Sequence, residues 1–255
     1  MINLNHKTFG QGNPIVILHG LFGTLDNWQT LGKQLAENHT VYLVDQRNHG
    51  RSPHHDDIDY PSMAEDLLYF LESNWIFKTA LIGHSMGGKT AMQFALMHPD
   101  MVDKLVVVDI APKTYPPGHQ DIFAALRSLD LRAIDERSEA DEQLKERIPD
   151  LSIRQFLLKG LTRTKSGHFR WKMNLESLYR NYDNLLAPPE ADAPYEGDAL
   201  FIRGGKSPYV KDEDFSLISE WFPKARVETI PEAGHWVHAD AGEQLVELIR
   251  GFVDS

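Results

Sequence analysis

The stretch Gly83-His84-Ser85-Met86-Gly87 places a serine between two glycines, directly after the apolar run at residues 80–82. A strand, Gly-x-Ser-x-Gly and a helix in this order form a sharp turn that exposes the serine hydroxyl. Bulky side chains two residues either side of that serine would collide, so glycine suits both positions. The following helix aims its N-terminus at the reacting centre and, with the Met86 N–H, favours a developing oxyanion. Ser85 is therefore the predicted nucleophile.

A second loop, His19-Gly20-Leu21-Phe22-Gly23, follows the apolar run at residues 15–18. An oxyanion hole needs two preset donors, one beside the nucleophile and one from another loop. We expect the Leu21 N–H to be the second donor and Phe22 to line the pocket. His19 precedes the turn, so we expect it to brace the loop by hydrogen bonding rather than to act as a base.

A serine hydroxyl is a poor nucleophile until a base takes its proton, and twelve histidines compete for that role. After a nucleophile of this kind, the acid and then the histidine follow along the chain. Two late candidates remain, His235 and His238. His235 follows Gly234 directly after the last predicted strand, where a loop can bring imidazole over the serine. We predict that His235 is the base and that His238 caps the final helix or packs. His84 is expected to shape the pocket.

Short apolar runs without polar alternation predict strands buried on both faces of a parallel sheet. They lie at residues 15–18, 41–44, 80–82, 105–108 and 199–202, and a further strand is predicted at 225–230. Helical patterns separate them, at residues 26–37, from about residue 62, from Ser85 to His98-Pro99, at 209–222 and at about 242–253. This alternation predicts an α/β fold with helices on both faces of a mostly parallel sheet.

The alternation stops between about residues 112 and 194, where no clear strand appears and prolines mark both edges. Ile122, Phe123, Leu126 and Leu129 indicate one helix, and Leu175, Leu178, Tyr179 and Tyr182 indicate another. The charged stretch at 130–150 is expected to be solvated helix surface. We predict a core of residues 1–111 and 191–255, with residues 112–190 as a helical cap inserted in it.

Composition narrows the classes of function. The chain has 255 residues and a formal net charge of −11, which disfavours nucleic acid and anionic membranes as partners. It contains no cysteine, which suits a reducing compartment. No secretion signal or membrane-spanning run is evident, so we expect a cytoplasmic monomer or weak homodimer acting on a small molecule. His54-His55-Asp56-Asp57 lacks the spacing of metal ligands and is expected to be a solvated loop, and no metal or cofactor is expected.

The elbow at Ser85, His19-Gly20, the loop at residues 45–52 and Gly234-His235 together resemble the α/β-hydrolase superfamily. The match covers the whole chain in motif order. More closely, the chain resembles the small bacterial YbfF-type esterases. The stretches that carry this resemblance are His19-Gly20-Leu21-Phe22-Gly23, Arg47-Asn48-His49-Gly50, Gly83-His84-Ser85-Met86-Gly87-Gly88-Lys89, Asp109-Ile110-Ala111-Pro112, Gly204-Gly205-Lys206-Ser207-Pro208-Tyr209-Val210 and Gly234-His235-Trp236-Val237-His238.

The acid departs from the usual superfamily pattern. Most members carry it after the next-to-last strand as Gly-x-x-Asp, but Ser207 stands at that place here. A hydroxyl cannot supply the charge that stabilises an imidazolium. Asp109, which closes the strand at 105–108, offers a replacement, and the resemblance to YbfF-type esterases implies this shifted acid with Ser207 as a fourth member. The alternatives are Asp212 and Asp214, or an Asp109 that only caps a turn.

These residues predict a two-step acyl transfer to water, on esters or thioesters with small to medium acyl groups. Phe22, His84, Phe123 and Trp236 are the expected pocket residues. Carbon–carbon bond hydrolases and cofactor-free peroxidases share the same scaffold and motifs and remain alternatives. So does a non-catalytic binding module built on a hydrolase frame. Related dehalogenases and epoxide hydrolases use an aspartate nucleophile, and Ser85 argues against both.

Overall fold

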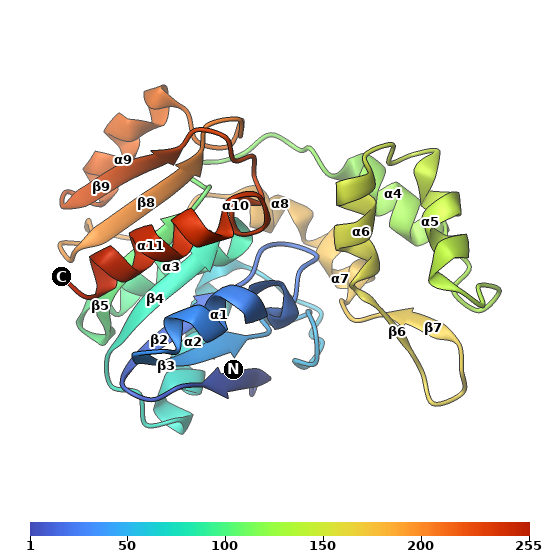
Figure 1. Ribbon diagram of the computed structural model, residues 1–255, viewed down its shortest axis with the longest axis horizontal. Coiled ribbons are helices and arrows are strands. Elements are labelled where there is room, and N and C mark those ends of the chain that lie inside the picture. Colours follow the sequence, from blue (N-terminus) through green and yellow to red (C-terminus); the bar gives the residue numbers. More distant parts are fainter.

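A computed structural model describes residues 1–255 and contains a seven-stranded sheet in the order β1-β3-β2-β4-β5-β8-β9 (Figure 1). Its strands are β1 (His6–Phe9), β2 (Asn13–Leu18), β3 (His39–Val44), β4 (Thr79–His84), β5 (Val102–Val108), β8 (Ala199–Gly204) and β9 (Ala225–Ile230). Every pairing is parallel except that of β1 with β3. The predicted mostly parallel sheet is confirmed. Of these seven strands only β1 was not predicted, because this partly exposed edge strand has no apolar run.

Helices cover both faces of this sheet, and the apolar runs explain why. Ile15 and Ile17 of β2 pack into one core with α1 (Gln29–Leu35) and α11 (Gly242–Val253). Their neighbour Val16 points to the other core, which contains α2 (Tyr60–Ser73), α3 (Met86–Met97) and α9 (Phe215–Trp221). Because alternate residues of a strand face opposite sides, a strand buried on both sides must be apolar throughout. No helix in the structure has the length and apolar character needed to cross a bilayer.

Some helix starts differ from the predicted ones because other groups cap them. The Asp59 carboxylate accepts a hydrogen bond from the Ser62 N–H at 2.7 Å, so α2 begins before Ser62. Short 3-10 turns at Leu25–Trp28 and Asp212–Asp214 precede α1 and α9, which are therefore shorter than expected. The ends of α3 and α11 agree with the sequence.

The segment between β5 and β8 is helical, as expected, but it also contains a small hairpin. Its helices are α4 (Gln120–Ser128), α5 (Arg137–Lys145), α6 (Leu151–Leu158), α7 (Leu175–Arg180) and α8 (Tyr182–Leu186). The expectation that no strand occurs here is wrong, because β6 (Leu161–Arg163) pairs antiparallel with β7 (Phe169–Trp171). Each of these strands is only three residues long and includes an arginine, so neither has the apolar run by which the other strands were recognised.

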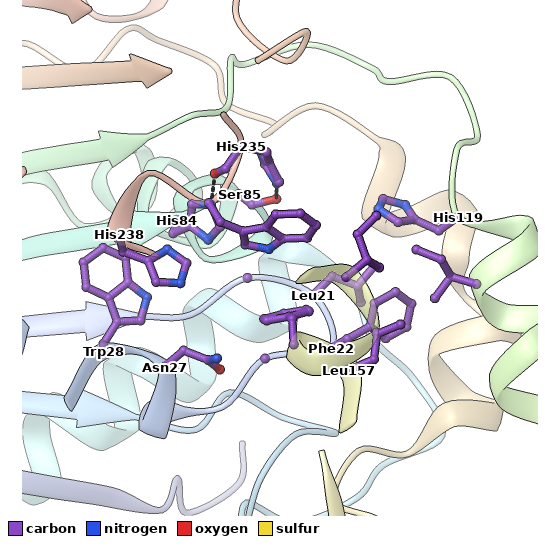
Figure 2. A pocket seen from close by; sticks show the side chains of 16 residues that line it. Leu21, Phe22, Asn27, Trp28, His84, Ser85, His119, Leu157, His235 and His238 are labelled. Atoms are coloured by element: carbon purple, nitrogen blue, oxygen red, sulfur yellow. Dashed lines mark hydrogen bonds between the residues drawn. The ribbon is translucent and has the colours of Figure 1, made fainter. Parts of the chain in front are cut away.

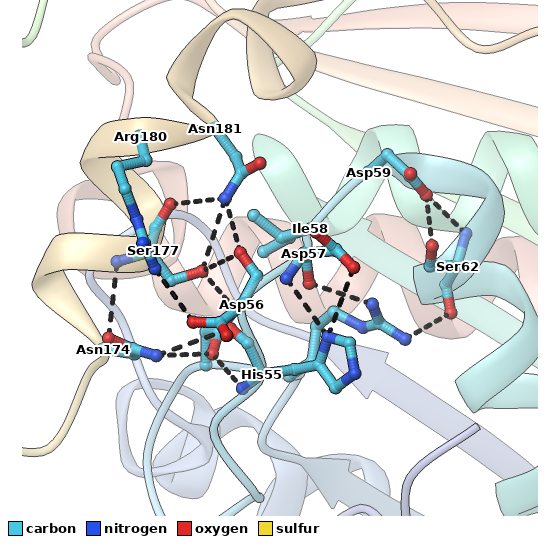
Figure 3. Close-up of polar contacts among 12 residues, drawn as sticks. His55, Asp56, Asp57, Ile58, Asp59, Ser62, Asn174, Ser177, Arg180 and Asn181 are labelled. Atoms are coloured by element: carbon cyan, nitrogen blue, oxygen red, sulfur yellow. Dashed lines mark hydrogen bonds and ion pairs between the residues drawn. The ribbon is translucent and has the colours of Figure 1, made fainter.

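This segment lies to one side of the sheet and is fastened to it by polar contacts (Figure 1). Figure 3 shows the contact between α7 and the loop that precedes α2. The Asp56 carbonyl accepts hydrogen bonds from Ser177 Oγ at 2.9 Å and Asn181 Nδ2 at 2.7 Å, and the Asp56 carboxylate pairs with Arg180 at 2.9 Å. The loop containing His54 to Asp57 is exposed, as expected, and it also anchors the inserted segment.

Candidate active site

Ser85 occupies the turn between β4 and α3 with φ 54° and ψ −119°, a strained conformation for a residue with a side chain. Its N–H donates to the Val108 carbonyl at 3.0 Å, which ties the turn to the end of β5. The flanking glycines are sterically required. A Cβ on Gly83 would lie 2.1 Å from the Gly87 carbonyl oxygen, and one on Gly87 would lie 2.5 Å from the Leu18 carbonyl oxygen. This crowding forces the serine side chain outward.

His235 lies in the loop between β9 and α10 (Val237–Asp240) and touches both Ser85 and Asp109. Its Nε2 is 3.0 Å from Ser85 Oγ, and its Nδ1 is 2.7 Å from Asp109 Oδ2. Because an ionised carboxylate only accepts hydrogen bonds, Nδ1 carries the ring proton and Nε2 presents a lone pair to the serine. A group that is to remove the serine proton needs this orientation.

Asp109 follows directly after β5, in a left-handed conformation with φ 53°. Its side chain is fully buried, and its N–H donates to the Ile202 carbonyl at 2.8 Å. The carboxylate oxygen that does not face His235 accepts the Gly204 N–H at 2.9 Å. Two hydrogen bonds to strand β8 thus hold Asp109 in place. Its carboxylate contacts His235 from the end of β5, one strand away from the usual position of the acid at the end of β8.

Ser207 lies in the turn after β8, where its hydroxyl donates to Asp109 Oδ2. Its Oγ also accepts the Tyr209 N–H at 3.2 Å. The hydroxyl is therefore bonded to the acid rather than to the imidazole. The alternative acids point elsewhere, since Asp212 pairs with Arg203 at 2.6 Å and Asp214 pairs with Lys113 at 2.6 Å.

The loop after β2 approaches the elbow closely. A Cβ on Gly20 would lie 3.3 Å from the Ser85 Cβ, so this loop and the nucleophile are in van der Waals contact. The N–H groups of Leu21 and Met86, the residues that follow Gly20 and Ser85, have no hydrogen-bond partner in the chain. Two free donors beside the serine are what an oxyanion hole requires.

His19 holds this loop in place, as expected. Its Nε2 accepts the Gln46 N–H at 3.1 Å, so its Nδ1 carries the proton and donates to the Gly20 carbonyl at 2.8 Å. Burial lowers the pKa of His19, which keeps the ring neutral and able to accept. Phe22 adopts φ 62°, and its N–H donates to His49 Nε2 at 3.3 Å. These bonds fix the backbone on both sides of Leu21.

A pocket in front of Ser85 lies between the core and the inserted segment (Figure 2). The expected residues Phe22, His84 and Trp236 line it, but Phe123 does not. Phe123 is fully buried behind Phe22, with 5.1 Å between the ring centroids, because α4 turns this side chain into the core of the inserted segment. The preceding residue, Ile122, faces the pocket instead.

His84 is neutral and bonded to the base loop. Its Nε2 donates to the His235 carbonyl at 2.8 Å, which anchors the backbone of the base. Burial, reinforced by the nearby His235 and His238, holds the pKa of His84 well below its ordinary value. His84 therefore contributes a fixed, uncharged wall rather than a second base.

Several neighbours of the site were not predicted to line it. The Tyr209 ring stacks on His235 with 3.8 Å between centroids and an angle of 16° between the planes, so it fixes the plane of the imidazole. His238 packs, as one of its two expected roles, against Trp28. The pocket residues that sequence reasoning missed share no motif; they are Asn27, Trp28, His119, Ile122, Ile153, Phe156, Leu157 and His238.

Comparison with known proteins places the chain in a family. Residues 13–241 match the family described as alpha/beta hydrolase fold. The chain belongs to the α/β-hydrolase family. The elbow, the shifted carboxylate and the late histidine described above therefore lie on the frame of an α/β-hydrolase.

Relatives of this hydrolase include enzymes named for ester chemistry. It is 37% identical to "Esterase YbfF" of Escherichia coli, over 95% of this chain and 93% of that protein. It is 44% identical to "sn-1-specific diacylglycerol lipase ABHD11" of Xenopus laevis, over 96% of this chain and 80% of that protein. A solved structure described as "Marine microorganism esterase" is 44% identical, covers 99% of this chain and 100% of its own, and superimposes with a TM-score of 0.97.

Proposed function

We propose that this protein is a serine carboxylesterase that hydrolyses esters, and also thioesters, of small to medium acyl groups through an acyl-enzyme on Ser85. Relatives named esterase and lipase support a hydrolase that acts on ester bonds. The observation that carries the mechanism is the row of contacts from Ser85 Oγ through His235 to Asp109, at 3.0 Å and 2.7 Å. A nucleophile, an oriented base and a buried acid in this geometry can activate the serine.

In the first step, Ser85 Oγ attacks the carbonyl carbon while His235 Nε2 takes its proton. The carbonyl electron pair moves onto oxygen, and the resulting charge is held by the Leu21 and Met86 N–H groups. Asp109 stabilises the imidazolium through its bond to Nδ1. The tetrahedral intermediate then expels the alcohol or thiol, which receives the proton from Nε2, and the acyl group stays on Ser85.

In the second step, water replaces the leaving group. His235 Nε2 takes a proton from the water as it attacks the acyl carbonyl, and the same two N–H groups hold the second oxyanion. Collapse of this intermediate returns the proton to Ser85 Oγ and releases the carboxylic acid. Ser207 acts in both steps as a positioning residue, because its hydroxyl donates to Asp109 Oδ2 and limits rotation of the carboxylate.

The inserted segment, residues 112–190, serves as a cap that shapes the acyl site. Ile122 and Leu157 from the cap and Phe22 from the core line the pocket. Figure 2 shows Leu157 and Phe22 on one side of Ser85. Contact with an apolar wall of this kind removes the hydrocarbon of the substrate from water, which makes the free energy of binding more favourable. Acyl chains are thus favoured over charged substrates.

Labelling with a fluorophosphonate tests the nucleophile. The probe is expected to form one adduct on Ser85, with the Ser85→Ala variant unlabelled and lacking ester turnover. Mass spectrometry of peptides identifies the modified residue. An unlabelled wild-type protein that turns over no ester would favour a non-catalytic binding module instead.

Substrate panels test the reaction class. We expect turnover of aryl esters and of acyl-CoA thioesters across a series of chain lengths, and none of vinylogous diketones. Cleavage of diketones in preference to every ester would replace the proposal with a carbon–carbon bond hydrolase. Peroxide-dependent halide oxidation faster than ester hydrolysis would point to a cofactor-free peroxidase.

A further inference from the structure

Two buried polar atoms in the pocket wall have no partner in the protein. They are Nε1 of Trp28 and Nδ1 of His238. Trp28 is 1% exposed and His238 is 9% exposed, and both residues line the pocket that contains Ser85. Their rings stack with 5.1 Å between centroids and an angle of 22° between planes. Because both atoms are themselves buried, a polar ligand group in the pocket reaches them only when the rings turn slightly toward it. Two such atoms without a partner mark a place for a polar ligand group.

Neighbouring buried histidines, in contrast to His238, have hydrogen-bond partners. His84 and His19 are as buried as His238, yet each has a defined hydrogen bond to the backbone. Buried polar groups in folded proteins are nearly always paired, since an unpaired group keeps its full desolvation cost. A partner supplied by the substrate would remove that cost on binding, which makes the same atoms selective for it.

The two sides of the pocket have different chemistry. Figure 2 shows Asn27, Trp28 and His238 together on one side of Ser85, and Phe22, Leu157 and other residues on the other side. We call the first group the polar wall. Asn27 Oδ1 is used by the Thr24 N–H at 2.7 Å, so the Asn27 amide N–H₂ group is left as a further donor.

The polar wall leads out of the pocket. Asn27 and His238 also line a second, larger groove, together with Phe156 and Trp236. Beyond these shared residues the groove is mainly polar; its other lining residues include Thr30, Gln34, Ser152, Gln155 and Lys159. A substrate part that passes the polar wall therefore continues toward polar surface rather than into the apolar cap.

We infer that Asn27, Trp28 and His238 bind an oxygen substituent, a hydroxyl or ether oxygen, on the alcohol part of the ester. This inference rests on the proposed function. In that mechanism the leaving alcohol receives a proton from His235 Nε2, so the alcohol part of the ester must lie next to His235. The His84 ring lies 4.9 Å from both the His235 ring and the His238 ring, so His84 alone links the polar wall to the base. The hydrocarbon of the acyl group then takes the opposite, apolar side.

The donors and acceptors suit such an oxygen. Trp28 Nε1 can only donate, and it would donate to a hydroxyl or an ether. Burial lowers the pKa of His238 to about 4, so its ring is neutral and offers one N–H and one lone pair. A hydroxyl can pair with Nδ1 in either tautomer, as acceptor from its N–H or as donor to its lone pair, whereas an alkyl group of the same size cannot.

Matched esters test the subsite. The first pair is 3-hydroxypropyl butanoate against butyl butanoate, and the second is 5-hydroxypentyl butanoate against hexyl butanoate. In each pair one hydroxyl replaces a terminal methyl. We expect the wild-type kcat/KM to favour the hydroxyl ester in at least one pair. Trp28→Phe keeps an aromatic ring without the N–H, and it should lower that preference about three- to tenfold, the usual effect of losing one hydrogen bond.

A second variant and a control separate binding from folding. His238→Phe also removes the polar atoms and should lower the same preference, so the inference does not depend on the folding of one variant. Trp75→Phe is the matched control, since Trp75 is 80% exposed in the turn between α2 and β4. It should leave the preference unchanged.

The outcomes distinguish this inference from the proposed function. Equal kcat/KM within both pairs, or a preference that survives both variants, would overturn the subsite while ester hydrolysis stands. A preference that appears only with the hydroxyl on the acyl side, as in butyl 6-hydroxyhexanoate against butyl heptanoate, would overturn the assignment to the alcohol. Hydrolysis of no ester by the wild-type protein would instead contradict the proposed function itself.

Discussion

The ends of the sheet strands and the inserted segment both build the pocket, but they are held in place differently. Ser85 and Asp109 directly follow neighbouring parallel strands, and each donates its N–H to a carbonyl of the next strand, at Val108 and Ile202. The positions of side chains placed in this way are fixed by the pairing register of the neighbouring strands. Their mutual distances are therefore set by backbone hydrogen bonds that the whole fold supports.

The inserted segment contributes side chains from helices instead. An apolar cluster that also includes Phe22 and Met86 of the core sets where those helices lie, and polar links add to this packing. One link is the buried Lys89, whose Nζ donates to the carbonyls of Leu186 at 2.9 Å and Ala187 at 2.6 Å, at the end of α8. The difference suggests that the core carries the chemistry and that the segment selects the substrate.

Removing the charge of the acid tests the core side of this comparison most strongly. Asp109→Asn should lower kcat about 10⁴-fold. The amide no longer selects the His235 tautomer with its proton on Nδ1, and it supplies no negative charge to stabilise the imidazolium. The loss should be the same for short and long acyl esters in steady-state assays. A loss confined to one chain length would mean that Asp109 acts through the pocket.

Ser207→Ala is the matched control for that experiment. It removes one hydrogen bond to Asp109 and keeps the carboxylate, so kcat should fall by only about tenfold. A larger loss than that of Asp109→Asn would show that the acid is wrongly assigned.

Acid titration of stability compares the two regions by a different measure. Five histidines have a pKa lowered by burial: His19, His49, His84, His119 and His238. Above their unfolded value of about 6.5 they are neutral in both states, and below it only the unfolded chain takes up protons. Stability should therefore fall as the pH falls from 6.5 toward 4, by up to about 1.4 kcal/mol per pH unit for each histidine. Urea unfolding at pH 7, 6 and 5 measures this slope.

Two variants test whether the core and the inserted segment contribute equally to this pH dependence of stability. The pKa of His49 in the core is about 3, and that of His119 in the inserted segment is about 4. If both regions unfold together, His49→Gln and His119→Gln should each lower the number of protons taken up on unfolding by about one. The dependence of the free energy of unfolding on pH then becomes less steep by the same amount in both variants. No change with His119→Gln would show that the inserted segment opens before the core.

An effect no larger than that of Ser207→Ala is expected from the cap side of the pocket. Ile122→Ala enlarges the apolar side, so kcat/KM for longer acyl chains should rise about tenfold relative to shorter ones. Leu151→Ala is the control, because Leu151 is 53% exposed on α6 and outside the pocket. An unchanged chain-length preference with Ile122→Ala would place acyl selection in the core.

Most of the frame around Ser85 is visible in local sequence patterns. Gly83 and Gly87 flank Ser85 because any side chain there would strike the backbone, so a local constraint is visible as a motif. The apolar runs gave the parallel sheet, since strands buried on both faces cannot carry polar residues. His235 could be chosen because a base must follow the last strand.

Tertiary structure decided what depends on contacts between distant segments. The acid could be named only through resemblance, because Asp109 and Ser207 meet by the pairing of β5 with β8. The orientation of α4, which no local pattern fixes, turned Phe123 away from the pocket and Ile122 into it. The polar wall formed by Asn27, Trp28 and His238 likewise exists only after folding, because the stacking of Trp28 on His238 joins residues more than two hundred positions apart.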